Sequence, residues 1–125
     1  MPLSLDHTIV PARDKVRSAE FIARIFGLQY EGAYGHFAPV RINEQLTLDF
    51  DDADDPRHNH YAFLATDEEF DSILGRIRDE GVTFGSGPRS RTDGEINHKH
   101  HGRGFYFECE NGHVWEVITH TYVTD

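Results

Sequence analysis

The sequence of 125 residues has little cysteine, little positive charge and no long apolar stretch. Its single cysteine, Cys109, excludes an internal disulfide framework and is typical of a reducing cytoplasm. Twelve Lys and Arg residues against 22 Asp and Glu leave a formal net charge of −10, without the basic patches that nucleic acids and anionic membranes require. No apolar run approaches the roughly 18 residues of a membrane span, and no charged-then-apolar leader begins the sequence. We therefore expect a cytoplasmic, single-domain protein without nucleic-acid or membrane partners.

The sequence does contain many histidines, nine in all, and an internal repeat. Residues 5–10 (LDHTIV) resemble residues 58–63 (HNHYAF), with His7 and His60 at equivalent places 53 positions apart. Both segments alternate in polarity and carry β-branched or aromatic residues, which predicts a strand in each half of the chain.

An amphipathic helix is predicted after each of these strands. In the first half Asp14 is the expected N-cap and Gly27 ends the helix. In the second half Thr66 and Glu69 have the spacing of a capping box, and Gly81 ends the helix. Apolar residues recur at helical spacing in both segments, so each helix should cover one face of a sheet.

Further strands are predicted after each helix, over residues 29–31, 36–42, 45–50, 82–84, 105–109 and 113–119. Each half then has the order β-α-β-β-β, which predicts an α+β fold. The expected organisation is a single domain over residues 1–125, with module 1 at about residues 1–52 and module 2 at about residues 57–125.

Three predicted strands each carry one polar residue on a face that is otherwise apolar: His7, His60 and Glu116. A lone histidine in such a place is usually a satisfied core residue, whereas an ionised carboxylate buried without a partner costs several kcal/mol. No Lys or Arg in these strands is placed to pair with Glu116. A divalent metal ion shared by the three side chains would satisfy all of them. Two histidines and one carboxylate, with coordination positions left open, suit Fe(II), Mn(II) or Zn(II).

A repeated βαβββ module with these three residues resembles the vicinal oxygen chelate superfamily, which includes glyoxalase I, bleomycin-resistance proteins, fosfomycin-resistance transferases and extradiol dioxygenases. The resemblance covers nearly the whole chain and is best over residues 5–10, 59–63, 104–107 and 111–116. It implies that the two modules form a half-open mixed-sheet barrel with a central metal cleft. It also implies that His7, His60 and Glu116 are the ligands of a divalent ion (Fe2+, Mn2+ or Zn2+).

Glyoxalase-like members of this superfamily have a fourth ligand on the last strand of the first module. In residues 45–50 the inward positions are expected to be Leu46, Leu48 and Phe50, which leaves Asp49 outside. Three ligands resemble the dioxygenases and the fosfomycin transferases more than glyoxalase I.

The chain departs from the fosfomycin transferases where those enzymes hold their substrate. Ile9 stands where they have a threonine, and residues 97–101 (NHKHH) stand where they have a serine-rich potassium loop. No arginine follows Glu116, whereas they carry a phosphonate-binding arginine there. Fosfomycin is therefore not the expected substrate.

The segment 85–104 is long for a loop in a compact domain, and long loops are often functional. It contains three histidines: His98, His100 and His101. A solvated polar loop is the simplest interpretation, and the alternative is that one of the three acts as an acid or base over the metal.

The hairpin before Glu116 decides which residue faces this carboxylate. A three-residue loop over 110–112 would place Tyr106 opposite Glu116, whereas a two-residue turn would place Phe107 there, and the family resemblance favours Tyr106. Strand alternation continued back from Tyr106 selects His100, so Tyr106 and His100 are the predicted catalytic residues. The remaining histidines, His113 among them, are expected at the surface or in turns.

These observations predict a metal-dependent enzyme that binds a small-molecule substrate through vicinal oxygens, with the ion as Lewis acid and template. An extradiol-type dioxygenase is favoured, because iron oxygenases use this set of ligands. A glyoxalase-like lyase or isomerase and a thiol transferase are alternatives. The alternative from another class is a metal-free protein that sequesters a cationic drug. Small members of the superfamily usually pair, so a homodimer is expected.

Overall fold

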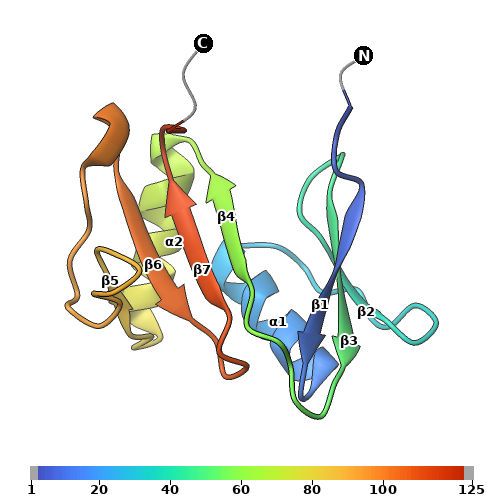
Figure 1. Cartoon of the computed structure of the whole chain (residues 1–125). Helices are drawn as coiled ribbons and strands as arrows, with labels where there is room; N and C mark the ends of the chain where they lie inside the picture. Colours follow the sequence, from blue (N-terminus) through green and yellow to red (C-terminus); the bar gives the residue numbers. More distant parts are fainter. Residues whose placement is uncertain (1–2, 123–125) are drawn as a thin grey trace. The chain divides into compact units, whose positions relative to one another are not determined.

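The computed structural model describes residues 3–122 and divides the chain into two compact units, Met1–Arg57 and His58–Asp125 (Figure 1). Among the described residues, each unit packs one α-helix on one unclosed sheet of mixed strands, which confirms the predicted α+β class. Neither α-helix within residues 3–122 has the length and apolar character needed to cross a membrane.

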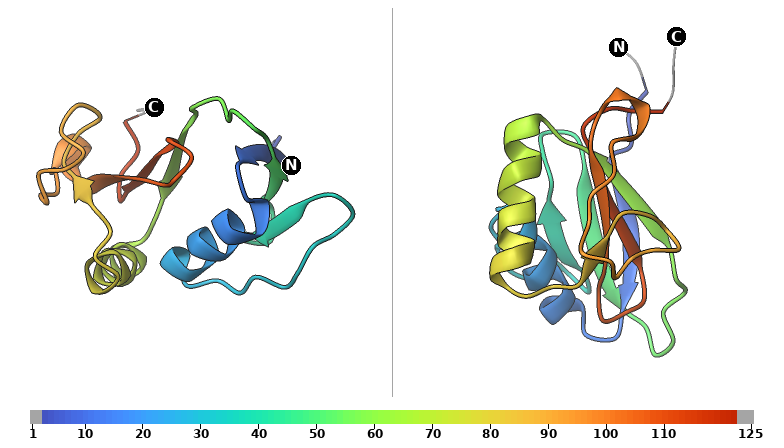
Figure 2. Two further views of the ribbon diagram at one scale, coloured as in Figure 1. Left: turned by 90° about the horizontal axis from the view of Figure 1, so that it is seen from below. Right: turned by 90° about the vertical axis from the view of Figure 1, so that its left-hand side faces the viewer.

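Unit 1 is a three-stranded sheet with the order β1-β3-β2. Strand β1 (His7–Ala12) lies parallel to β3 (Thr47–Asp52), and β2 (Ala38–Arg41) lies antiparallel on the other side of β3. Helix α1 (Lys15–Phe26) covers one face of this sheet (Figure 2). The core between helix and sheet is apolar and almost fully buried: Val10, Ala12, Leu48 and Phe50 from the strands, and Ala19, Ile22 and Ile25 from the helix.

Unit 2 is a four-stranded sheet with the order β4-β7-β6-β5. Its strands are β4 (His60–Leu64), β5 (Phe84–Gly85), β6 (Gly104–Glu108) and β7 (Val114–Ile118), and β4 and β7 are parallel. Helix α2 (Asp67–Asp79) covers one face, and a short 3-10 helix, η1 (Lys99–His101), precedes β6 (Figure 2). The core under α2 is rich in aromatic residues: Phe70, Ile77, Phe105, Phe107, Trp115 and Val117.

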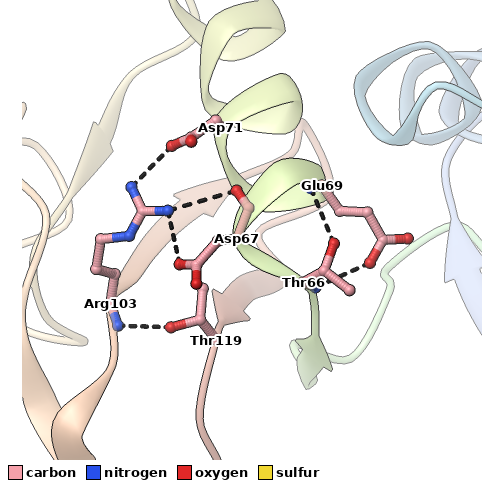
Figure 3. Close-up of polar contacts among 6 residues, drawn as sticks. All are labelled: Thr66, Asp67, Glu69, Asp71, Arg103 and Thr119. Atoms are coloured by element: carbon pink, nitrogen blue, oxygen red, sulfur yellow. Dashed lines mark hydrogen bonds and ion pairs between the residues drawn. The ribbon is translucent and has the colours of Figure 1, made fainter.

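The predicted helix ends are confirmed. The Asp14 side chain accepts a hydrogen bond from the Arg17 N–H at 3.1 Å, and Gly27 ends α1 in the left-handed conformation with φ 71°. At the start of α2, the Thr66 Oγ1 accepts from the Glu69 N–H at 3.1 Å. The Glu69 carboxylate accepts from the Thr66 N–H at 2.9 Å, which completes the capping box (Figure 3).

Arg103 joins the segment before β6 to the first turn of α2 (Figure 3). Its guanidinium donates to Asp71 at 2.7 Å and to Asp67 at 2.9 Å, and it lies 4.4 Å from the centre of the Phe70 ring. Its backbone N–H donates to the Thr119 hydroxyl at 2.8 Å. One side chain therefore fixes the helix N-terminus against the strand that carries Tyr106.

The predicted strands differ from the observed ones mainly in unit 1. Residues 29–31 form no strand, so unit 1 has the order β-α-β-β rather than β-α-β-β-β. A three-residue segment gives very little alternation, and the ladders of unit 1 join only β1, β3 and β2. In unit 2 all four predicted strands are present, with β5 reduced to two residues.

The face of each sheet opposite its helix is the more exposed one, and we call it the open face. In unit 1 it carries His7 and Ile9, and in unit 2 it carries His60, Leu64 and Glu116. Ile9 is 51% exposed and Leu64 is 66% exposed, so these apolar residues lie outside the cores under α1 and α2. Alternation separates the two faces of a strand but does not say which face a helix covers.

Candidate metal site

Unit 2 brings His60 and Glu116 together on its open face. They lie on the adjacent parallel strands β4 and β7, and His60 Nε2 is 2.8 Å from Glu116 Oε1. The His60 side chain is 51% exposed and that of Glu116 is 16% exposed. An imidazole nitrogen and a carboxylate oxygen are both donors that divalent ions take from proteins. By the chemistry of these donors, the pair could supply two ligands to one divalent ion.

Tyr106 lies beside Glu116 on the next strand. The register of β6 and β7 places the two residues opposite each other, which confirms the predicted pairing. The ladder ends at Glu108 and Val114, so the loop is longer than predicted, and Gly112 is left-handed in it with φ 82°. Burial, together with a hydrogen bond to Glu116, raises the pKa of Tyr106 to about 12. At neutral pH its hydroxyl is therefore a hydrogen-bond donor to the carboxylate and not a base.

His7 begins β1 in unit 1, as His60 begins β4 in unit 2. Each of these strands is parallel to the last strand of its own unit. His7 Nδ1 lies 2.7 Å from Asp6 Oδ2, and this hydrogen bond raises the pKa of His7 above its ordinary value. Within residues 3–122, no group of three or more His, Cys, Asp or Glu side chains could hold a metal ion. His7 as the third ligand therefore stays a prediction.

Asp49 lies on the same face of its sheet as His7, contrary to the prediction. The parallel register of β1 and β3 pairs Ile9 with Asp49, and paired residues share a face. Leu48 and Phe50, which were predicted to face inward toward a metal, are 1% exposed on the side that α1 covers. The sequence pattern identified the apolar face of β3 correctly, but that face packs against α1.

Asp49 and Glu116 occupy equivalent places on the open faces of the two units. Asp49 is opposite Ile9, two residues after His7, and Glu116 is opposite Ala62, two residues after His60. Each unit therefore presents a histidine and, at the equivalent place on the last strand of the unit, a carboxylate.

A comparison with known proteins identifies the family of this chain. The profile of the Glyoxalase/Bleomycin resistance protein/Dioxygenase superfamily matches residues 4–117. The chain belongs to this superfamily. Glutathione transferase FosA of Serratia marcescens is 25% identical to it over 121 residues, which cover 91% of this chain and 79% of FosA.

Solved structures of other proteins have the same fold. Oxidase ChaP-H2 is 46% identical, with a TM-score of 0.92 over 99% of this chain and 98% of its own. Oxidase ChaP-H1 is 41% identical, with a TM-score of 0.91 over 98% of this chain and 100% of its own. The fosfomycin resistance protein FosX of Mesorhizobium loti, at 20% identity and a TM-score of 0.69 over 98% of this chain and 96% of its own, is similar in fold alone.

In this superfamily member, the histidines of the loop before β6 are exposed. His100 lies in η1 with φ 56°, and its ring is 6.0 Å from that of Tyr122. Strand β6 begins only at Gly104, so the alternation that selected His100 does not extend to it. His98 and His101 are also exposed, and the ring of His101 lies 6.4 Å from that of His120. Of the two predicted catalytic residues, Tyr106 is the one that the register of β6 and β7 places opposite Glu116.

Sequence reasoning missed a buried histidine close to His60. His113 was expected at the surface, but it is fully buried, and its Nδ1 accepts a hydrogen bond from the Asn59 N–H at 3.0 Å. The Asn59 side chain in turn donates to the Tyr61 hydroxyl at 3.0 Å. This network fixes the backbone just before His60. No local signal could reveal it, because the bonded residues are 54 positions apart.

Proposed function

We propose that this chain is a metal-dependent enzyme that binds a small oxygenated substrate through two neighbouring oxygens and uses O2, as an extradiol-type dioxygenase does. The observation that carries the proposal is the contact of 2.8 Å between His60 and Glu116, with Tyr106 hydrogen-bonded to the same carboxylate. Two structural relatives that cover nearly the whole chain are oxidases, at 46% and 41% identity, which favours chemistry that uses oxygen.

The proposed ligands are His60 and Glu116 from unit 2 and His7 from unit 1. Two imidazoles and one carboxylate suit Fe2+, Mn2+ or Zn2+ and leave coordination positions for substrate oxygens. When bound, such an ion supplies Lewis-acid chemistry and stabilises negative charge on a substrate oxygen. The chain itself orients the Glu116 carboxylate between His60 and the Tyr106 hydroxyl.

The open face of unit 2 favours an uncharged or weakly charged substrate. Strands β4, β6 and β7 contain no Lys or Arg. Arg91 contacts Glu108 on β6 at 3.0 Å, and this ion pair neutralises the positive charge of Arg91. Phosphonates and thiolates are usually bound by cations, so a fosfomycin-type thiol transfer has less support than oxidation of a neutral oxygenated compound.

A glyoxalase-like lyase or isomerase is the second candidate, and one observation favours it. Asp49 lies on the open face of unit 1, in the place equivalent to that of Glu116, and glyoxalase-like relatives take a fourth ligand from that strand. The substitution Asp49→Asn separates the two. It should leave metal affinity unchanged in a three-ligand dioxygenase and weaken it in a four-ligand lyase.

Proton transfer is the proposed role of His100. Imidazole titrates near neutrality and can act as either acid or base. Single substitutions His98→Ala, His100→Ala and His101→Ala would test it. A drop in kcat confined to His100→Ala supports the role of His100 in proton transfer. Equal kcat values in the three variants would contradict it.

The function is tested by loading the chain with Fe2+ under anaerobic conditions and adding catechols, 2-oxoaldehydes or epoxides. The proposal expects catechols to perturb the metal spectrum and to support O2 uptake once air is admitted. Turnover of 2-oxoaldehydes without O2 would favour the lyase. A chain that is purified without chelator and takes up no Fe2+, Mn2+ or Zn2+ would instead be a metal-free binding protein.

A further inference from the structure

Asp6 forms a close pair with His7 at the beginning of β1. The Asp6 carbonyl accepts a hydrogen bond from the Thr47 N–H at 2.9 Å, so the Asp6 backbone is held by β3. Its carboxylate Oδ2 lies 2.7 Å from His7 Nδ1. Both side chains are exposed, so solvent screens the charge of the pair and it contributes little to folding stability. A pair that is weak for stability can still fix the orientation and proton position of the ring.

The carboxylate determines which nitrogen of His7 carries the proton. An ionised carboxylate only accepts hydrogen bonds, so the facing nitrogen, Nδ1, must be the donor. In the neutral ring the other nitrogen, Nε2, then keeps its lone pair, which is what a metal ion requires. A free imidazole side chain in water favours the opposite form, with the proton on Nε2. Without Asp6 the ring would therefore hold its proton on the nitrogen that a metal should bind.

The second unit does not repeat this arrangement. Asn59 precedes His60 as Asp6 precedes His7, but the Asn59 side chain donates to the Tyr61 hydroxyl at 3.0 Å. The His60 ring contacts the Glu116 carboxylate through Nε2. The carboxylate that contacts Nδ1 is thus a feature of unit 1, since in unit 2 the carboxylate contacts the histidine at Nε2.

We propose that Asp6 is a positioning residue that holds His7 with its proton on Nδ1 and keeps Nε2 available to a divalent metal ion. The metal half of this inference rests on the proposed function, whereas the tautomer half does not. Loss of an outer carboxylate partner of a histidine ligand lowers metal affinity about 10- to 100-fold, and we expect an effect of that order here.

The tautomer is tested by long-range proton–nitrogen NMR of His7 in metal-free protein, at a pH where the ring is neutral. The full chain and Asp6→Ala are compared, with Asp51→Ala as the matched control. Asp51 lies in the same unit and pairs with His36 at 3.3 Å, so its loss removes the same charge and a similar contact. We expect the Nδ1–H form in the full chain and in Asp51→Ala, and the Nε2–H form in Asp6→Ala. An Nε2–H ring in the unsubstituted chain overturns the inference.

Titration of the same three proteins with Zn2+ tests the metal half. Affinity should fall about tenfold or more in Asp6→Ala and stay unchanged in Asp51→Ala. Equal Zn2+ affinity in all three overturns the positioning role. A full chain that binds no Zn2+, Mn2+ or Fe2+ would overturn the proposed function together with the metal half, and the NMR result would still decide the tautomer.

Discussion

At the scale of single residues, Glu116 is the group whose neighbours define the candidate site. Its carboxylate contacts His60 at 2.8 Å and accepts a hydrogen bond from Tyr106. Hydrogen bonds to a charged partner contribute about 1.5–3 kcal/mol each, so these two neighbours can offset much of the cost of its partial burial. The sequence had offered no cation for this carboxylate, and the structure supplies a ring nitrogen and a hydroxyl instead.

The Tyr106 hydroxyl should lose its proton only at strongly alkaline pH. Its pKa is raised from 10.0 to about 12 in the folded chain, so the folded state holds this proton more tightly than the unfolded state. The resulting stabilisation is fully present below about pH 10 and is lost as the pH rises toward 12. Burial also raises the pKa of Tyr61, so titration of phenolate absorbance should show late-titrating tyrosines, of which one is missing in Tyr106→Phe. If the two titration curves coincide, Tyr106 does not donate to Glu116 as described.

Individual histidines were the hardest residues to assign from the sequence. His7 and His60 could be selected because the repeat places them at equivalent positions. His113 could not, since its burial depends on Asn59 and on the stack of rings around Trp115, whose members come from distant parts of the chain. His100 was selected by extending a strand that in fact begins at Gly104.

At the scale of elements, the contact of Arg103 with α2 is a specific source of stability in unit 2 (Figure 3). Exposed ion pairs contribute about 0.2–1 kcal/mol each, and a solvent-accessible cation over an aromatic ring about 0.5–1 kcal/mol. Arg103→Ala should therefore lower the free energy of unfolding by about 1–2 kcal/mol in urea denaturation. Arg91→Ala, which breaks one ion pair with Glu108, serves as the control and should cost less. Equal losses in the two variants would show that the contacts with α2 add nothing.

The loop between β5 and β6 should loosen in acid. Asp93 accepts hydrogen bonds from the Ser86 hydroxyl at 2.6 Å, the Ser86 N–H at 3.0 Å and the Glu95 N–H at 2.9 Å. The Ser86 hydroxyl is the main cause of the lowered pKa of Asp93. Because the pKa is lower in the folded state, this stabilisation is present above the ordinary pKa of 3.8 and is lost as the pH falls below it.

Hydrogen-exchange protection of the Ser86 and Glu95 amides, corrected for intrinsic rates, measures this effect. Protection should fall between neutral pH and pH values below 3.8 in the native chain. In Asp93→Ala it should already be low at neutral pH. Protection that is independent of both pH and the substitution would contradict the role given to Asp93.

Helix boundaries were predictable because their signals are local. Asp14, Gly27, Thr66 and Glu69 act within one turn of the helix they cap, and all four do what the sequence indicated. Strand boundaries depend on partners elsewhere in the chain, which explains the missing strand at 29–31 and the two-residue β5. The side of β3 that faces α1 was likewise decided by packing, and so Asp49 was placed on the wrong face.

At the scale of the whole molecule, the repeat explains both the fold and the distribution of candidate ligands. Each unit pairs its first and last strands in parallel and carries a histidine and a carboxylate on its open face. The sequence was sufficient to identify the superfamily, which the match over residues 4–117 confirms. Substrate identity could not be obtained in the same way, because it depends on loops and on side chains outside the repeat.

The chain is predicted to form a homodimer. Small superfamily members usually pair, and large apolar side chains are exposed in both units, among them Ile9, Tyr34 and Leu64. Light scattering should give twice the chain mass of 14.3 kDa. A mass of 14.3 kDa across the accessible concentration range would refute the prediction.

The most direct test of the account is the metal content of the purified chain and of its Glu116→Gln variant. Glu108→Gln is the matched control, since Glu108 lies on the neighbouring strand but pairs with Arg91. The account predicts about one tightly bound divalent ion per chain in the full protein and in Glu108→Gln. It predicts loss of tight binding in Glu116→Gln, with an unchanged circular dichroism spectrum. Undiminished metal binding by Glu116→Gln would contradict it.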